Sequence, residues 1–268
     1  QLALAPGHAA AALVDLQRAV DRAPAEPDYR LALADALFAA QAYDRAKEQL
    51  DAAAQQMPNS VAVLFRRAVV NFTRANYASA ADDLSAVLGL AAPPGGGVQN
   101  PARWQAWRGL MRLQSSLYGD ASDDVRASLQ AEPENPSALY LQGLVDYYQN
   151  DLPGALAAFD QVLQHNPAEY DCPFFNPLNG YEVNADRGYI FYLQQDFPPA
   201  IAAFTRSIEI YPAWAQAYAY RADAYADAGQ PELAIADYRS ALQLARTRDE
   251  RDSYQQALDA LLAQTPAP

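Results

Sequence analysis

Histidine and cysteine, which often ligate metals or act as nucleophiles, are rare in this chain and badly placed for either task. The two histidines, His8 and His165, have neither a cysteine nor a second histidine near them at metal-ligand spacing. The single cysteine, Cys172, lies beside a proline with no basic residue nearby to activate its thiol. No nucleophile elbow, phosphate-binding glycine loop or paired Ser–His motif occurs. We therefore expect no catalytic residue, metal site or cofactor, and predict that the protein is not an enzyme.

Three neighbouring aspartates, Asp120, Asp123 and Asp124, resemble a carboxylate cluster. They come at the start of a predicted helix, where negative charge suits the unpaired N–H groups and the helix dipole. We interpret them as helix-capping residues rather than as a site.

The overall charge limits the class of partner. The chain has 19 Lys and Arg against 32 Asp and Glu, a formal net charge of −13, whereas binding to nucleic acid or anionic lipid depends on basic residues. No stretch approaches the roughly 18–20 consecutive apolar residues of a membrane-spanning helix. We expect a soluble protein that binds a protein or peptide, does not bind nucleic acid and does not insert into a membrane.

The elements that would carry a site recur with a period of 34 residues. Alanines that open short apolar helices are 34, 34, 41, 34, 45 and 34 residues apart, at Ala12, Ala46, Ala80, Ala121, Ala155, Ala200 and Ala234. A second set of small residues follows the same steps, at Ala34, Ala68, Gly109, Gly143, Gly188 and Ala222. Prolines close the units in the same phase, at Pro24, Pro58, Pro133, Pro167 and Pro212. Insertions of 7 and 11 residues account for the longer steps.

Each unit has the layout of a helix–turn–helix repeat. In the second half, apolar residues recur at i, i+4 and i+8 and define one buried stripe, for example at Ala155, Phe159 and Leu163. Asp151 and Asp196 are placed to cap second helices. A small residue in the first half, such as Gly143, would let the partner helix approach closely, with an aromatic side chain filling the remaining gap.

Together these features resemble the tetratricopeptide repeat family. The segment from Tyr218 to Leu244, YAYRADAYADAGQPELAIADYRSALQL, is the nearest match. The resemblance implies an all-α fold, a right-handed superhelical solenoid of antiparallel helix pairs with about six and a half repeats and a C-terminal capping helix. In four units an arginine replaces the family's leucine, at Arg67, Arg108, Arg187 and Arg221.

We expect a single array over residues 1–268. A half repeat (5–26) precedes six repeats at 27–60, 61–94, 102–135, 136–169, 181–214 and 215–248. The capping helix covers 249–264, and the insertions cover 95–101 and 170–180.

The N-terminal end raises two expectations. The first predicted helix is of the second type, and without a preceding helix its Leu13, Leu16 and Val20 would be exposed to solvent. We therefore expect another subunit or a missing upstream segment to cover these three side chains. The chain also begins at Gln1 rather than at a methionine, which indicates either a trimmed chain or removal of a signal or anchor segment. We favour a periplasmic or other extracytoplasmic location over a cytoplasmic one.

In the family, first helices line the inner surface, so the resemblance implies a groove. Its residues would form a stripe that includes Asp223 and Asp227 and is otherwise largely apolar and rich in tyrosine. Some family members bind a C-terminal carboxylate with basic residues at these places, and this stripe has no comparable set of basic residues. The partner-binding candidates are Phe65, Phe72, Leu110, Tyr140, Leu144, Tyr147, Tyr148, Tyr189 and Tyr192. Alternatively, several of these rings pack between adjacent first helices and only hold the repeats together.

The second insertion places aromatic side chains in a loop, at Tyr170, Phe174 and Phe175. They either fold back onto neighbouring helices or contact a partner, since loops on a rigid array often carry binding. From all these features we predict a scaffold or adaptor that binds a partner segment in its groove. The alternative is a structural or assembly subunit of a larger complex, such as an extracytoplasmic bacterial one.

Overall fold

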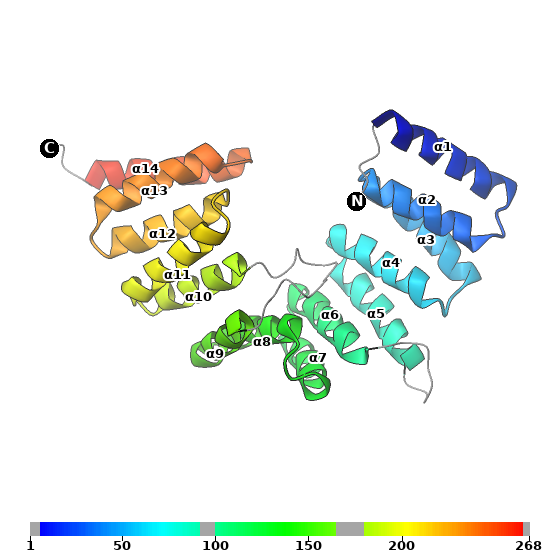
Figure 1. Cartoon of the computed structure of the whole chain (residues 1–268), viewed down its shortest axis with the longest axis horizontal. Helices are drawn as coiled ribbons and strands as arrows, with labels where there is room; N and C mark the ends of the chain where they lie inside the picture. The colour runs from blue at the N-terminus through cyan, green and yellow to red at the C-terminus, as the bar shows by residue number, and fades with distance from the viewer. Residues whose placement is uncertain (1–5, 92–99, 165–179, 265–268) are drawn as a thin grey trace. The chain divides into compact units, whose positions relative to one another are not determined.

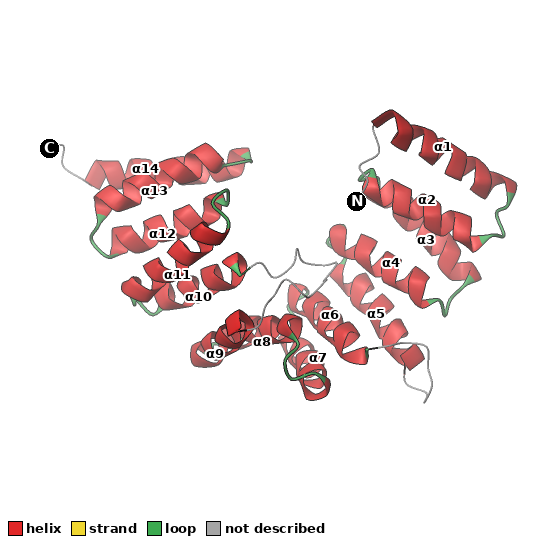
Figure 2. Cartoon of the chain, viewed as in Figure 1, coloured by secondary structure: helices red, strands yellow, loops and turns green. Residues whose placement is uncertain are grey.

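The computed structural model describes residues 6–91, 100–164 and 180–264, and every regular element in these ranges is an α-helix (Figure 2). The predicted all-α fold is therefore confirmed. The chain divides into two compact units, residues 1–145 and 146–268, and we describe each by itself.

Unit 1 is a succession of helices in which each packs against the next from α1 to α7 (Figure 1). The helices are α1 (Pro6–Arg22), α2 (Pro27–Ala39), α3 (Tyr43–Gln56), α4 (Val61–Thr73), α5 (Tyr77–Ala91), α6 (Pro101–Gln114) and α7 (Tyr118–Ala131). Helix α8 (Pro136–Tyr148) begins in unit 1 and ends in unit 2.

Unit 2 repeats this arrangement, with each helix packed against the next from α9 to α14. The helices are α9 (Leu152–Gln164), α10 (Tyr181–Leu193), α11 (Phe197–Ile210), α12 (Ala215–Asp227), α13 (Pro231–Leu244) and α14 (Arg248–Gln264). Helix α10 also contacts α12, the next first helix along the chain.

The turn inside each helix pair is the same structure six times. The second residue after the first helix has a positive φ, from 57° to 74°. The next backbone N–H bonds to a carbonyl five residues back, as in Ala42 to Leu37 at 2.9 Å. This is the Schellman pattern that closes helix C-termini. The positive-φ residues are Gln41, Ala75, Ser116, Asn150, Gln195 and Gly229.

Close packing within a pair depends on the small residue of the first helix, as predicted. A Cβ atom on Gly188 would lie 2.7 Å from the Phe204 ring of the partner helix, and Phe204 is 1 % exposed. The glycine therefore makes room for the aromatic side chain.

The predicted caps are only partly confirmed. The Asp151 carboxylate accepts the Gly154 backbone N–H at 3.0 Å, but Asp196 makes no side-chain cap bond to α11. At the start of α14, Thr247 and Glu250 form a reciprocal capping box, in which each side chain accepts the other's backbone N–H at 3.1 Å.

The interpretation of Asp124 as a capping residue was wrong. Its carboxylate is buried between α6 and α7 and accepts hydrogen bonds from Arg108 at 2.5 Å and Arg112 at 2.7 Å. Asp123, one residue away, is exposed and pairs with Arg126. The difference follows from helix geometry, because consecutive residues point about 100° apart and only one can face the partner helix.

The same ion pair recurs in other helix pairs and explains the arginines that replace the family's leucine. Arg67 bonds to Asp83 and Arg221 to Asp237, each sixteen residues ahead, as Arg108 bonds to Asp124. The fourth arginine, Arg187, has no aspartate sixteen residues ahead, because residue 203 is an alanine. It pairs instead with Asp160 of the preceding helix at 2.7 Å.

The expected exposure of the apolar residues on α1 was also wrong. Val20 is 5 % exposed and belongs to a buried cluster with Leu33 and Leu37 of α2, and Leu13 and Leu16 pack against that cluster. Helix α1 thus turns this stripe toward the following helix, where Val20 is buried and Leu13 and Leu16 are partly buried. Val14 is the residue left 51 % exposed.

Candidate functional site

Tyrosine side chains gather on the first helices of unit 2. We call this group the tyrosine row: Tyr147, Tyr148, Tyr189, Tyr192 and Tyr220. Ring centroids are 6.3 Å apart for Tyr147 and Tyr189, 6.3 Å for Tyr189 and Tyr192, and 5.8 Å for Tyr189 and Tyr220. The structure thus brings together four tyrosines of the predicted stripe.

Tyr220 was missed by the sequence reasoning. It lies on α12, three residues before Asp223, the first residue of that helix that the sequence analysis placed on the stripe. Its residue type could have indicated it, because a tyrosine close to a stripe position has a side chain long enough to reach the neighbouring stripe.

Carboxylates lie beside the tyrosine row on α12. The Tyr192 hydroxyl donates to Asp227 at 2.7 Å and so joins α10 to α12, and this hydrogen bond is the main cause of the raised pKa of Tyr192. The Tyr238 hydroxyl reaches from α13 and donates to Asp223. The face therefore combines aromatic surface with negative charge.

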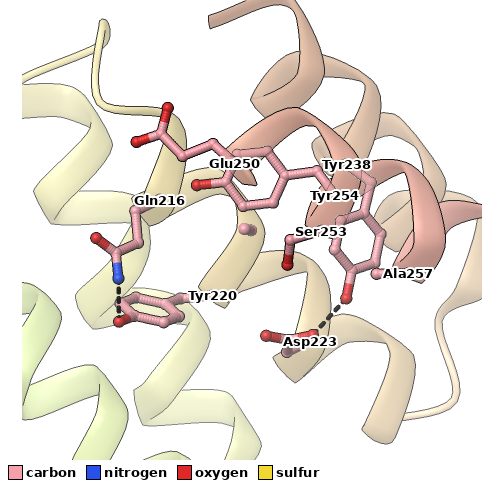
Figure 3. A pocket seen from close by; sticks show the side chains of 9 residues that line it. Gln216, Tyr220, Asp223, Tyr238, Glu250, Ser253, Tyr254 and Ala257 are labelled. Atoms are coloured by element: carbon pink, nitrogen blue, oxygen red, sulfur yellow. Dashed lines mark hydrogen bonds between the residues drawn. The ribbon is translucent and has the colours of Figure 1, made fainter. Parts of the chain in front are cut away.

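A pocket of about 410 Å³ lies at the end of this face, between α12 and α14 (Figure 3). Tyr220 belongs to both the tyrosine row and the pocket. Its lining is polar and aromatic, and comprises Gln216, Ala219, Tyr220, Asp223, Tyr238, Glu250, Ser253, Tyr254 and Ala257. We refer to it as the α12–α14 pocket.

Two candidates of unit 1, Phe65 and Phe72, pack against other aromatic side chains. Phe65 on α4 stacks on Trp107 at 5.3 Å and meets Trp104 edge-on at 5.3 Å, both on α6. Phe72 packs against Tyr77 at the start of the next helix, at 5.5 Å. These contacts give both phenylalanines a role in joining helices, and both remain partly exposed.

The remaining candidates differ in access. Leu110 is 2 % and Tyr140 is 9 % exposed, so both side chains belong to the core and we leave them out of the proposed surface. Leu144 is partly buried. Phe174 and Phe175 lie outside the residues that the structure describes.

Within the described ranges, no group of His, Cys, Asp and Glu is arranged to hold a metal ion; His165 and Cys172 fall outside those ranges. None of the helices there has the length and apolar character needed to cross a membrane.

Comparison with known proteins identifies the repeat. Two family models, both described as tetratricopeptide repeat, match residues 3–68 in one case and residues 108–170 and 185–250 in the other, together more than half of the chain. The chain belongs to the tetratricopeptide repeat family. Proteins of this family generally mediate protein–protein interactions and are typically non-enzymatic scaffolds. The search of curated proteins gave no match.

Solved structures share the fold at low sequence identity. A tetratricopeptide repeat protein from Parabacteroides merdae is 15 % identical with a TM-score of 0.73, over 96 % of this chain and 93 % of that one. A chain of the APC/C hetero-tetramer Cut9–Hcn1 is 17 % identical with a TM-score of 0.71, over 94 % of this chain but only 46 % of that one. YrrB, described as having an unusual peptide-binding site, is 15 % identical with a TM-score of 0.50, over 74 % and 92 % of the two chains. At these identities the likeness concerns the fold alone.

Proposed function

We propose that this tetratricopeptide repeat protein is a scaffold or adaptor that binds a segment of a partner protein on the tyrosine row of unit 2. Membership of a family that generally mediates protein–protein interactions supports the proposal. The description of YrrB as a peptide-binding repeat protein supports it further.

The observation that carries the proposal is the tyrosine row itself. Tyr148 is 52 % exposed, and Tyr147, Tyr189 and Tyr192 are partly exposed, so their rings offer apolar area to a bound segment. Tyrosine suits this task because it gives a large contact area with only two side-chain torsions to fix. Tyrosine is also enriched among residues that dominate binding energy.

The tyrosine row also helps to hold neighbouring helices together. The bond from Tyr192 to Asp227 and the ring contact of Tyr189 with Tyr220 both connect α10 to α12. The binding and structural contributions must therefore be separated by the choice of variant, with Tyr148 as the most exposed member.

The test is co-purification of the native complex through the tagged full chain from cells of the source organism. We expect the double variant Tyr147→Ser and Tyr192→Ser to lose the partner that the wild type retains, because both rings leave the binding face. The matched control is Ile210→Ser with Leu233→Ser, two apolar residues 40 % and 48 % exposed on second helices, and it should retain the partner.

Retention of the partner by a folded Tyr147→Ser/Tyr192→Ser protein would overturn the proposal. If thermal unfolding shows that the double variant is destabilised, the single variant Tyr148→Ser decides. Its exposed ring can be removed with little effect on folding, so an unchanged complex would equally count against binding on the tyrosine row.

A second candidate function is that of a structural subunit packed along its length in a larger complex. Exposed apolar side chains outside the tyrosine row favour it, among them Val14 at 51 %, Leu233 at 48 % and Ile210 at 40 %. If this function holds, the Ile210→Ser/Leu233→Ser control would be the variant that loses its partners.

A further inference from the structure

The α12–α14 pocket has the size of a ligand site and the lining of a site for a positive charge. Its volume of about 410 Å³ falls within the range of about 300–1,000 Å³ for small-ligand sites. Two carboxylates, Asp223 and Glu250, and three phenols line it, and none of its nine lining residues is Lys, Arg or His.

The side chains are arranged so that polar groups converge on the space between the two helices. Gln216, Tyr220 and Asp223 come from α12, and Ser253 and Tyr254 come from α14 (Figure 3). The Tyr238 hydroxyl donates to Asp223, and a carboxylate that accepts a phenol hydrogen bond can still bind a cation through its remaining lone pairs.

The pKa values of several groups in the pocket are raised mainly by burial and to a smaller extent by neighbouring carboxylates. Burial raises the pKa of Asp223, and burial together with nearby carboxylates raises the pKa of Tyr220 and of Tyr254. Backbone hydrogen bonds from Arg246 and Thr247 lower the pKa of Glu250. A cation placed among these groups would relieve the cost of the partly buried Asp223 charge.

The arginines of the surrounding helices do not supply that cation. Arg221, the sole basic residue of α12, bonds to Asp237 of α13 at 2.7 Å. On α14, Arg248 and Arg251 are exposed and are not among the pocket's lining residues. Arg246, just before α14, donates its backbone N–H to Glu250, and its positive charge also helps to lower the pKa of that carboxyl. Its guanidinium bonds to Tyr211 at 3.2 Å and is not among the groups that line the pocket.

We propose that the α12–α14 pocket binds a cationic side chain, arginine or lysine, of the partner segment that lies on the tyrosine row. Asp223 pairs with the cation, and the rings of Tyr220 and Tyr254 provide faces for it. The inference rests on the proposed function, and Tyr220 connects the two because it belongs to both surfaces. The unit already uses this chemistry internally, since the Arg221 guanidinium lies 5.8 Å from the ring centroids of Tyr218 and Tyr225.

A displayed library of random twelve-residue peptides, selected against the full chain, tests the proposal. The wild type should select peptides with Arg or Lys at one fixed position among apolar residues. Replacing that residue by citrulline, which is neutral and similar in shape to arginine, should weaken binding about tenfold in fluorescence anisotropy, the scale of one desolvated cation contact.

The decisive variant is Asp223→Asn, which keeps an oxygen that can accept from Tyr238. This variant should bind the arginine and citrulline peptides with equal affinity. The control is Asp259→Asn, which makes the same change of charge at an exposed position on α14 and should keep the difference in affinity. Selected peptides without a fixed basic position, or an arginine preference that survives Asp223→Asn, would overturn the pocket proposal.

Failure of the underlying function looks different. Selection of no peptide at all, or of peptides that bind the folded Tyr148→Ser and Tyr147→Ser/Tyr192→Ser variants as well as the wild type, would contradict binding on the tyrosine row. Peptides that depend on the row but have no basic preference would contradict only the pocket.

Discussion

At the scale of single residues, Gly188 shows how one missing side chain fixes the distance between two helices. An added Cβ would meet ring carbons of Phe204 at 2.7 and 2.8 Å, and overpacking of this kind costs about 1–3 kcal/mol. We expect Gly188→Ala to lower the free energy of unfolding measured by urea denaturation, although alanine is the better helix former.

Gly89 is the matched control, since a Cβ there meets nothing within 4 Å. The variant Gly89→Ala should raise stability by about 0.5–1 kcal/mol because helix propensity alone acts. Stabilisation by both substitutions would contradict the close approach at Gly188.

The buried ion pairs give a second prediction at this scale. Asp124 is 4 % exposed in its side chain and binds Arg108 and Arg112, so Asp124→Asn leaves two guanidinium groups without their anion. We expect a loss of about 3 kcal/mol in the free energy of unfolding.

The adjacent Asp123 is the control for this loss. Its side chain is 69 % exposed and pairs only with Arg126, which is 61 % exposed, so Asp123→Asn should change stability by about 0.5 kcal/mol or less. Equal effects at the two positions in chemical denaturation would show that Asp124 is not the buried member of the pair.

At the scale of elements, the six turns make a prediction about backbone strain. Ala75 has a φ of 57°, a conformation that costs a residue with a Cβ about 1–2 kcal/mol. We expect Ala75→Gly to raise the melting temperature, whereas Ala32→Gly, at an exposed position inside α2, should lower it through lost helix propensity. A lower melting temperature for Ala75→Gly would argue against the left-handed turn.

The elements themselves could be predicted from the sequence because their signals recur in phase. The small residues, apolar stripes and closing prolines each repeat at the same steps, so an ambiguous unit is resolved by its neighbours. A single repeat, read alone, offers only a short periodic pattern that fits several structures.

Burial of individual side chains could not be predicted in the same way. Leu110 and Tyr148 were placed on one stripe, yet Leu110 is 2 % and Tyr148 is 52 % exposed. A position within a helix fixes the direction of a side chain but not what the neighbouring helix places opposite it. For the same reason the pairing of Arg108 with Asp124 became visible only when both helices were in place.

At the scale of the molecule, the proposal places partner binding on the first-helix face of unit 2 rather than on its second helices. The two faces offer matched probes, because Tyr148 at the end of α8 is 52 % exposed and Leu233 on α13 is 48 % exposed. Because the two positions are similarly accessible, a difference in crosslinking between them reports where the partner binds and not how exposed each position is.

The most direct measurement is site-specific photo-crosslinking in cells of the source organism, with a photoreactive amino acid at position 148 or at position 233 and mass spectrometry of the products. We predict that one partner protein crosslinks through a defined segment at position 148 and not at position 233. Crosslinks to that partner from position 233 alone, or equally from both positions, would contradict binding on the tyrosine row.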